Sequence, residues 1–138
     1  MKNDFIEAEA DFNKAVLIEP ESGQINNTIW LFYLDLEDTH SEFVDYPRAL
    51  LYEKKAATLS ELHVVQNSLA MAYYFNNEFD ETISILKVRN FINEPEWALW
   101  LGLAYLGKED EMNARYYLGM ALDNGADVPQ EVKDYLNQ

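Results

Sequence analysis

The sequence predicts an all-α chain built from repeated pairs of helices. Apolar residues recur at helical spacing along nearly the whole chain, and few segments alternate as β-strands do. Small and aromatic residues also recur at one fixed offset. The same offset separates three pairs of landmarks: Leu69 and Leu101, Tyr73 and Tyr105, and Thr82 and Ala114. A shared offset of this size indicates a repeat of one supersecondary unit.

Helix start and stop signals divide the chain into eight expected helices. Asp45 is a good N-cap, and Pro47 falls in the first turn of the helix that it opens. Pro95 and Pro129 open two later helices, and Gly125 breaks the one between them. The expected helices cover 3–18, 24–38, a segment after Asp45, a segment from Ser60, 79–91, a segment from Pro95, 110–123 and 129–137.

The first full repeat is longer than the later ones. The separation of Tyr33 from Ala49 exceeds that of Tyr73 from Thr82, and that of Tyr105 from Ala114, by seven positions. The composition of residues 38–42, Asp-Thr-His-Ser-Glu, favours a loop that projects as a finger. Longer helices are the alternative, because seven positions are close to two helical turns.

The landmarks resemble the tetratricopeptide repeat (TPR), which reads W-x-x-L-G-x-x-Y, then Ala, a large apolar residue and Pro, over about 34 residues. The three copies read Ile29-Trp30-x-x-Tyr33, Leu69-Ala70-x-x-Tyr73 and Leu101-Gly102-x-x-Tyr105. In the first copy, Trp30 replaces a small residue and Glu53 stands where an aromatic is usual. The resemblance covers roughly residues 4–126.

This resemblance implies one α-α superhelical (solenoid) domain over residues 1–138. Its expected parts are an N-terminal half repeat at 3–20, repeats at about 23–61, 62–94 and 95–127, and a capping helix at 129–137.

The resemblance also implies protein binding without catalysis, through a concave face lined by the first helix of each pair. The family's ligand-facing positions fall on Asn27, Leu31, Leu34, Asn67, Met71, Tyr74, Leu99, Trp100, Leu103 and Leu106. This set is apolar apart from two asparagines, which could hydrogen-bond a peptide backbone. Some members of the family bind the C-terminal carboxylate of a partner through Lys, Arg and Asn on this face, but no Lys or Arg stands at those positions here. An apolar groove with an acidic rim is similar to the small acidic repeat chaperones of type III secretion.

Two alternatives stay open for these surfaces. Leu99, Leu103 and Met71 could instead be core residues, covered by neighbouring repeats or by the last helix. The N-terminal helix carries Phe5 and Phe12 without a first helix of its own unit. The chain is then a piece of a longer array, or this helix makes a homodimer or docks into a larger assembly, in which case the protein is a scaffold; an ordinary cap of the array is the further alternative.

The net charge indicates which kinds of partner the chain would attract or repel. The chain has a formal charge of −15. Residues 1–45 hold 11 acids and 2 bases, a balance of −9, and residues 94–138 hold 9 acids and 3 bases, a balance of −6. Such a field repels nucleic-acid phosphates and favours a basic or amphipathic protein segment, although solubility alone would also explain it.

The sequence offers no constellation of catalytic residues. There is no Cys, and the two His residues and five Gly residues form no nucleophilic, metal-binding or phosphate-binding motif. His40 lies among Asp38, Glu42 and Asp45, but their spacing matches no standard metal site. We therefore expect no enzymatic activity, no metal and no cofactor. No apolar run is long enough to cross a bilayer, which favours a cytoplasmic protein without membrane contact.

Overall fold

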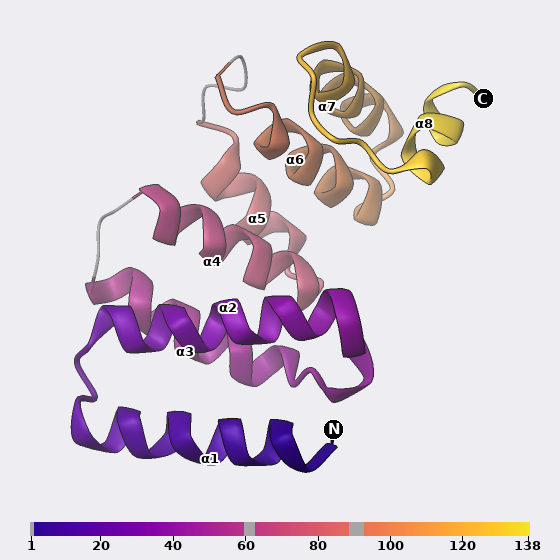
Figure 1. Ribbon diagram of the computed structural model, residues 1–138. Helices are drawn as coiled ribbons and strands as arrows, with labels where there is room; N and C mark the ends of the chain where they lie inside the picture. Colours follow the sequence, from indigo (N-terminus) through magenta and orange to yellow (C-terminus); the bar gives the residue numbers. More distant parts are fainter. Residues whose placement is uncertain (1, 60–62, 89–92) are drawn as a thin grey trace. The chain divides into compact units, whose positions relative to one another are not determined.

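A computed structural model describes residues 2–59, 63–88 and 93–138, and over these residues the chain is all-helical (Figure 1). The helices are α1 (Lys2–Ile18), α2 (Gly23–His40), a short 3-10 helix η1 (Ser41–Phe43), α3 (Tyr46–Leu59), α4 (His63–Phe75), α5 (Phe79–Leu86), α6 (Pro95–Gly107), α7 (Glu111–Asp123) and α8 (Gln130–Leu136). The predicted all-α class is confirmed. The expected helix over 79–91 is shorter in the structure, where α5 ends at Leu86. The expected helix start at Ser60 lies outside the described residues.

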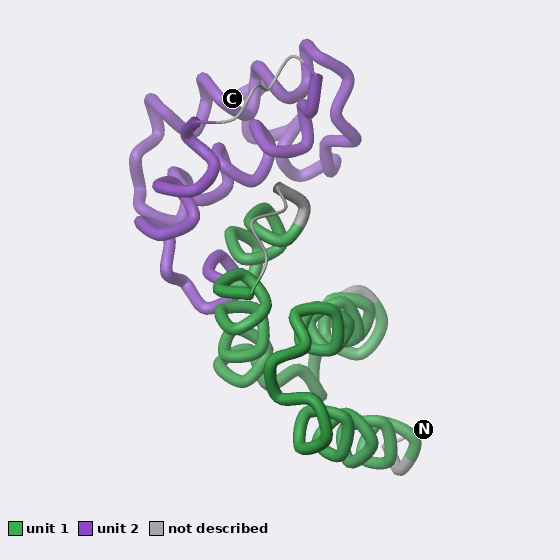
Figure 2. Tube along the Cα trace, turned by 90° about the vertical axis from the view of Figure 1, so that its left-hand side faces the viewer, with its two compact units in different colours: residues 1–72 green, residues 73–138 purple. Residues whose placement is uncertain are grey.

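The chain divides into two compact units, residues 1–72 (unit 1) and 73–138 (unit 2), shown in Figure 2. The boundary falls inside α4, within the repeat that the sequence predicts over 62–94. Each unit is described by itself.

Unit 1 is organised around the antiparallel pair α2 and α3. The Ser22 hydroxyl caps α2 by accepting from the Ile25 amide at 3.3 Å, and the Asp45 carboxylate caps α3 by accepting from the Arg48 amide at 3.1 Å. At the far end of the pair, a Cβ on Gly23 would lie 3.3 Å from Leu59 Cβ. The buried apolar side chains of the pair are Ile29, Trp30, Tyr33 and Leu36 from α2, and Ala49, Leu50 and Ala56 from α3.

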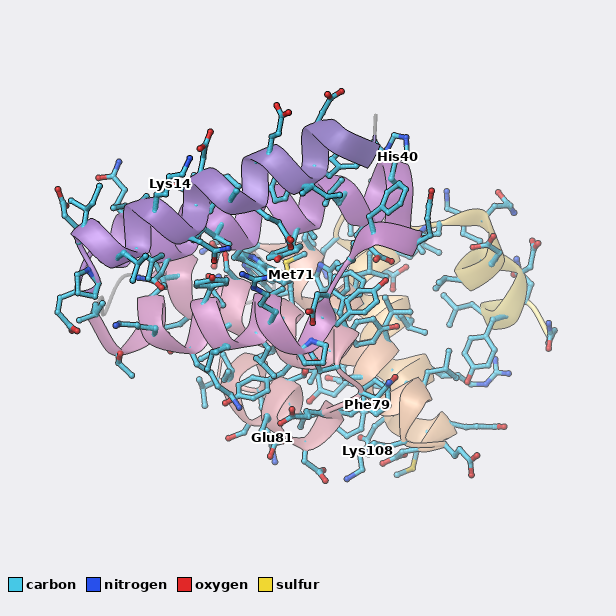
Figure 3. All side chains as sticks on the ribbon, turned by 90° about the horizontal axis from the view of Figure 1, so that it is seen from below. Lys14, His40, Met71, Phe79, Glu81 and Lys108 are labelled. Atoms are coloured by element: carbon cyan, nitrogen blue, oxygen red, sulfur yellow. The ribbon has the colours of Figure 1, made fainter. Side chains whose placement is uncertain are left out.

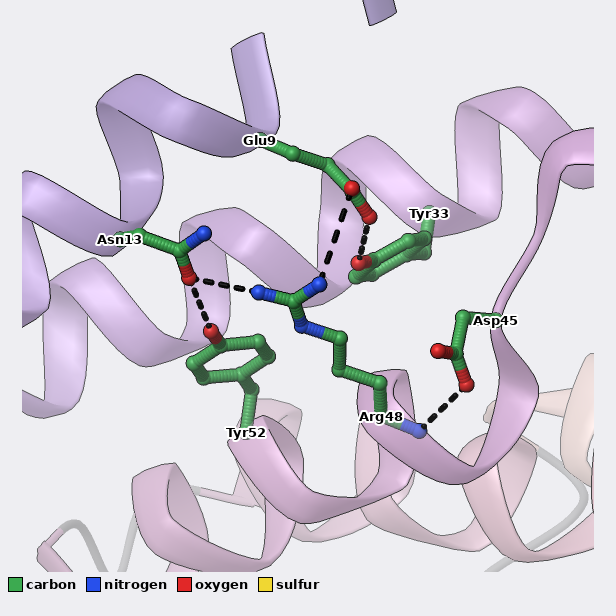
Figure 4. A network of polar contacts seen from close by, with 6 residues as sticks. All are labelled: Glu9, Asn13, Tyr33, Asp45, Arg48 and Tyr52. Atoms are coloured by element: carbon green, nitrogen blue, oxygen red, sulfur yellow. Dashed lines mark hydrogen bonds and ion pairs between the residues drawn. The ribbon is translucent and has the colours of Figure 1, made fainter. Parts of the chain in front are cut away.

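Helix α1 is attached to this pair mainly by rings and polar contacts. The Phe12 ring lies 5.1 Å from that of Phe32, and the Phe5 ring lies 5.3 Å from that of Phe43. A polar network adds to these ring contacts (Figure 4). Its contacts are Tyr33 hydroxyl to Glu9 Oε1 at 2.5 Å, Arg48 Nη2 to Asn13 Oδ1 at 2.6 Å, Tyr52 hydroxyl to Asn13 Oδ1 at 3.0 Å, and the ion pair of Arg48 Nη1 with Glu9 Oε2 at 3.6 Å. Burial and the bond to Glu9 both raise the pKa of Tyr33, so the phenol stays protonated and donates.

The predicted loop over residues 38–42 is wrong, because residues 38–40 belong to α2 and residues 41 and 42 to η1. Helix α2 continues to His40 and contains 18 residues, against 13 in α4 and in α6. The Thr39 hydroxyl donates to the Asp35 carbonyl at 2.8 Å, and the His40 ring lies 5.2 Å from that of Phe5. Contacts with α1 therefore hold the last turn of α2, and most of the extra residues lengthen a helix instead of forming a finger.

Unit 2 is organised around α6, which is apolar on nearly every side and whose buried residues are Ala98, Leu99, Leu101, Gly102 and Ala104. Helices α5 and α7 pack against it. A Cβ on Gly102 would lie 2.7 Å from Leu118 Cγ and 2.9 Å from the Leu118 amide nitrogen, so α6 and α7 cross in close contact. One core cluster joins α6, α7 and the C-terminal segment; its buried members are Ala98, Leu99, Leu118, Ala121, Ala126, Val128 and Val132.

The turn between α4 and α5 and the turn between α6 and α7 have the same backbone geometry. The Glu78 amide donates to the Tyr73 carbonyl at 3.0 Å, and in the next repeat the Asp110 amide donates to the Tyr105 carbonyl, also at 3.0 Å. Both turns place a non-glycine residue at positive φ, with values of 60° at Asn77 and 61° at Glu109. The offset that relates the sequence landmarks therefore also relates the backbone geometry of these turns.

Two glycine substitutions should move stability in opposite directions. Gly102→Ala forces a methyl group against the Leu118 backbone, and we expect the free energy of unfolding to fall by about 1–3 kcal/mol. Gly119, in the middle of α7, has nothing within 4 Å of an added Cβ, so Gly119→Ala should raise the free energy of unfolding by about 0.5–1 kcal/mol. Denaturant unfolding of both variants measures this, and equal effects would contradict the helix crossing.

Candidate functional site

The predicted partner-binding residues are distributed over both units. Asn27, Leu31, Leu34, Asn67 and Met71 belong to unit 1, and Tyr74, Leu99, Trp100, Leu103 and Leu106 belong to unit 2.

In unit 1, Leu31 is the most accessible residue of the predicted set, with 49% of its surface exposed. Leu34 on α2 and Met71 on α4 (labelled in Figure 3) are half-buried. The two asparagines were expected to hydrogen-bond a peptide backbone, but the structure places their side-chain oxygens differently. The Oδ1 atoms of Asn27 and Asn67 are both buried and accept no hydrogen bond within the described chain. Their amide oxygens therefore lie inside the protein instead of on its surface.

In unit 2, the apolar stripe of α6 is partly core. Leu99 is only 8% exposed and belongs to the core cluster, and Leu103 packs against that cluster. The last helix, through Val132, closes the same cluster. The alternative in which part of the stripe is core therefore describes Leu99, which is not available to a partner in this structure. Leu106 remains half-buried.

The half-buried aromatic residues of unit 2 form a cluster around Trp100. Its ring is 5.2 Å from that of Tyr74 and 5.6 Å from that of Phe75, and both pairs meet edge to face. The Tyr74 ring is also 5.6 Å from that of Phe79, and burial raises the pKa of the Tyr74 phenol. Large, rigid aromatic side chains that are partly exposed supply much of the binding energy in protein interfaces. In unit 2, Tyr74 and Trp100 are therefore the side chains best suited to a partner.

The two residues of the predicted oligomer face have partners inside the chain. Phe12 packs on Phe32, and Phe5 packs on His40 and Phe43. The lengthened α2 and η1 therefore cover this part of α1, as the cap alternative expects. Homodimerisation through α1 stays a prediction, which light scattering would test.

The surroundings of His40 differ from those of a metal ligand. Its ring lies against Phe5 and Phe43. Among the described side chains, no three His, Cys, Asp or Glu residues gather closely enough to hold a metal ion. Within the same part of the chain, no helix combines the length and apolarity needed to cross a membrane.

Comparison with known proteins assigns no family: no family model matches the chain, and no curated protein matches it. Function is therefore inferred from the chain's own residues.

Glu53 is a buried carboxyl group whose environment the sequence did not predict. It has 0% exposure, and neither carboxyl oxygen has a hydrogen-bond partner within the described residues. Burial raises its pKa to about 8. The signal was present in the spacing, because Glu53 follows Ala49 by one helical turn and precedes Ala56 by another, on the buried face of α3.

The raised pKa of Glu53 predicts that stability falls as pH rises. Below the ordinary pKa of 4.5, Glu53 is neutral in both the folded and unfolded states, so the folded state carries no penalty. Between pH 4.5 and about 8 the unfolded state loses this proton while the folded state retains it, which costs about 1.4 kcal/mol per pH unit. Glu53→Gln should remove this component of the slope in denaturant unfolding measured from pH 5 to 8.

The control is Glu81→Gln, which changes an exposed glutamate on α5 (labelled in Figure 3) and should keep the wild-type slope. Identical slopes for wild type and Glu53→Gln would contradict the burial of a neutral carboxyl group.

Proposed function

We propose that the chain is a TPR-type protein-binding module without catalytic activity, which binds a peptide or helical segment of a partner through the first helices of its repeats. The observation that carries this proposal is the copied turn of unit 2. Equivalent hydrogen bonds and the same positive φ recur at the offset of the sequence landmarks, so α4–α5 and α6–α7 are joined in the same way. Repetition of one helix pair is the basis of α-solenoids, whose extended surfaces bind other proteins.

The side chains available on those first helices support the proposal. Leu31 on α2 is exposed, and Tyr74 on α4 and Trp100 on α6 are half-buried, so each repeat offers at least one large apolar side chain. Aromatic anchors beside aliphatic residues are typical of binding surfaces. Because Leu99 is core, the proposed surface is narrower than the sequence alone suggests.

Charge defines the chemistry of the partner. The balances of −9 over residues 1–45 and −6 over residues 94–138 attract a basic or amphipathic segment and repel nucleic acid. An adaptor or a chaperone-like holder of such a segment fits this pattern. The proposed activity involves no cofactor.

Affinity capture from an extract of the source cells, followed by mass spectrometry, tests this function. Leu31→Asp places a charge on the exposed part of the surface, and Trp100→Ala removes the aromatic anchor. We expect each to lower recovery of the same partner by about tenfold, as for interface hot spots. Leu103 is a poorer choice, because it packs against the core of unit 2.

The matched control is Leu51→Asp, which changes a leucine of α3 that is 66% exposed. It should recover the partner as wild type does, and circular dichroism should show that all variants remain helical. Recovery of the same proteins by wild type, Leu31→Asp and Trp100→Ala would rule out this surface.

A further inference from the structure

The outward face of α7 carries apolar side chains where a solvent-exposed helix normally carries charges. Ala114, Leu118 and Ala121 face the core. On the opposite side, Met112 and Tyr116 are 78% and 61% exposed, one helical turn apart. Gly119 continues the same row one turn later. Within unit 2, α6 and α8 pack on the inner side of α7 (Figure 1) and leave this row uncovered.

Gly119 is the one glycine of the chain that the structure itself does not require. Gly102 admits Leu118, Gly107 admits the Phe79 ring, Gly23 admits Leu59, and Gly125 has a φ of +89°. Gly119 lies in the middle of a helix, where glycine is destabilising, and nothing lies within 4 Å of its absent Cβ. At Gly102 the missing side chain lets α7 approach α6 closely, and Gly119 would let another helix approach α7 in the same way.

The charges around the row are mostly negative. Glu111 and Asp123 are exposed on α7. Arg115, the one base of α7, donates to the Tyr135 carbonyl at 3.2 Å and lies 4.5 Å from the centre of the Tyr135 ring, and Lys108, which precedes the helix, pairs with Asp80 (Lys108 is labelled in Figure 3). A second copy of the chain would bring the same acids against one another. The charge pattern therefore selects a cationic partner.

We propose that the row Met112–Tyr116–Gly119 on α7 is a docking surface for a basic amphipathic helix, whose backbone crosses α7 at Gly119. The apolar side of that helix packs on Met112 and Tyr116, and its flanking Lys or Arg residues meet Glu111 and Asp123. The surface lies on the second helix of its pair, so it is separate from the binding surface proposed above.

The probe is a fluorescently labelled synthetic helix of about 18 residues, long enough to span α7, with leucine on one face and lysine elsewhere. Fluorescence anisotropy with the full chain should show saturable binding. We expect Tyr116→Ala and Gly119→Leu each to weaken binding at least about tenfold, and the same peptide with glutamate in place of lysine not to bind. Gly119→Ala should also weaken binding while stabilising the fold, so the loss cannot come from unfolding.

Two control variants locate the bound peptide. Leu17→Ala removes a side chain of α1 that is 83% exposed, and Leu51→Ala removes one of α3 that is 66% exposed; both should bind the peptide as wild type does. Equal affinity in wild type, Tyr116→Ala and Gly119→Leu, or an equal loss in Leu17→Ala, would overturn the proposal. A dimer in light scattering that Tyr116→Ala dissociates would also overturn it and assign the face to a second copy.

Discussion

The close crossing of α6 and α7 is the constraint on which unit 2 depends. With glycine at position 102, the Leu118 side chain and backbone occupy the space of a missing Cβ. The two helices then share a core that the C-terminal segment closes through Ala126, Val128 and Val132. This closure explains why an almost uniformly apolar helix is tolerated in α6. It also explains why Leu99, which the sequence predicts on the binding surface, is buried in the core.

Unit 1 solves the same packing problem differently. The position equivalent to Gly102 is held by Trp30, which is 2% exposed, while α3 carries Ala49 and Ala56 where α7 carries Ala114 and Ala121. The longer α2 offers an additional face, on which α1 packs through aromatic rings. Polar contacts of Glu9 and Asn13 with Arg48 join α1 to α3 as well (Figure 4). One sequence pattern thus produces two kinds of helix pair, according to whether the first helix carries glycine or tryptophan at this position.

Local signals in the sequence predicted most helices, because capping and breaking residues act over a few positions. Asp45, Pro95 and Gly125 have the roles expected of them. The failures involve contacts between distant segments. Residues 39–40 have the composition of a loop, but the His40 ring packs against Phe5. Leu99 was expected on the binding surface, but it belongs to the core cluster that also contains Val132. Glu53 could have been found from its spacing, but its pKa depends on burial that no local pattern fixes.

The turn that joins α4 to α5 recurs in the turn that joins α6 to α7, and the proposed repeat rests on this recurrence. Asn77 and Glu109 test it most directly, because both have positive φ, which costs a residue with a side chain about 1–2 kcal/mol in the left-handed region and costs glycine nothing. We would measure the free energy of unfolding of Asn77→Gly, Glu109→Gly and the helical control Glu111→Gly. The account predicts that stability rises in Glu109→Gly, rises less in Asn77→Gly and falls in the control. A loss of stability in both turn variants, like that of the control, would contradict the repeated turn.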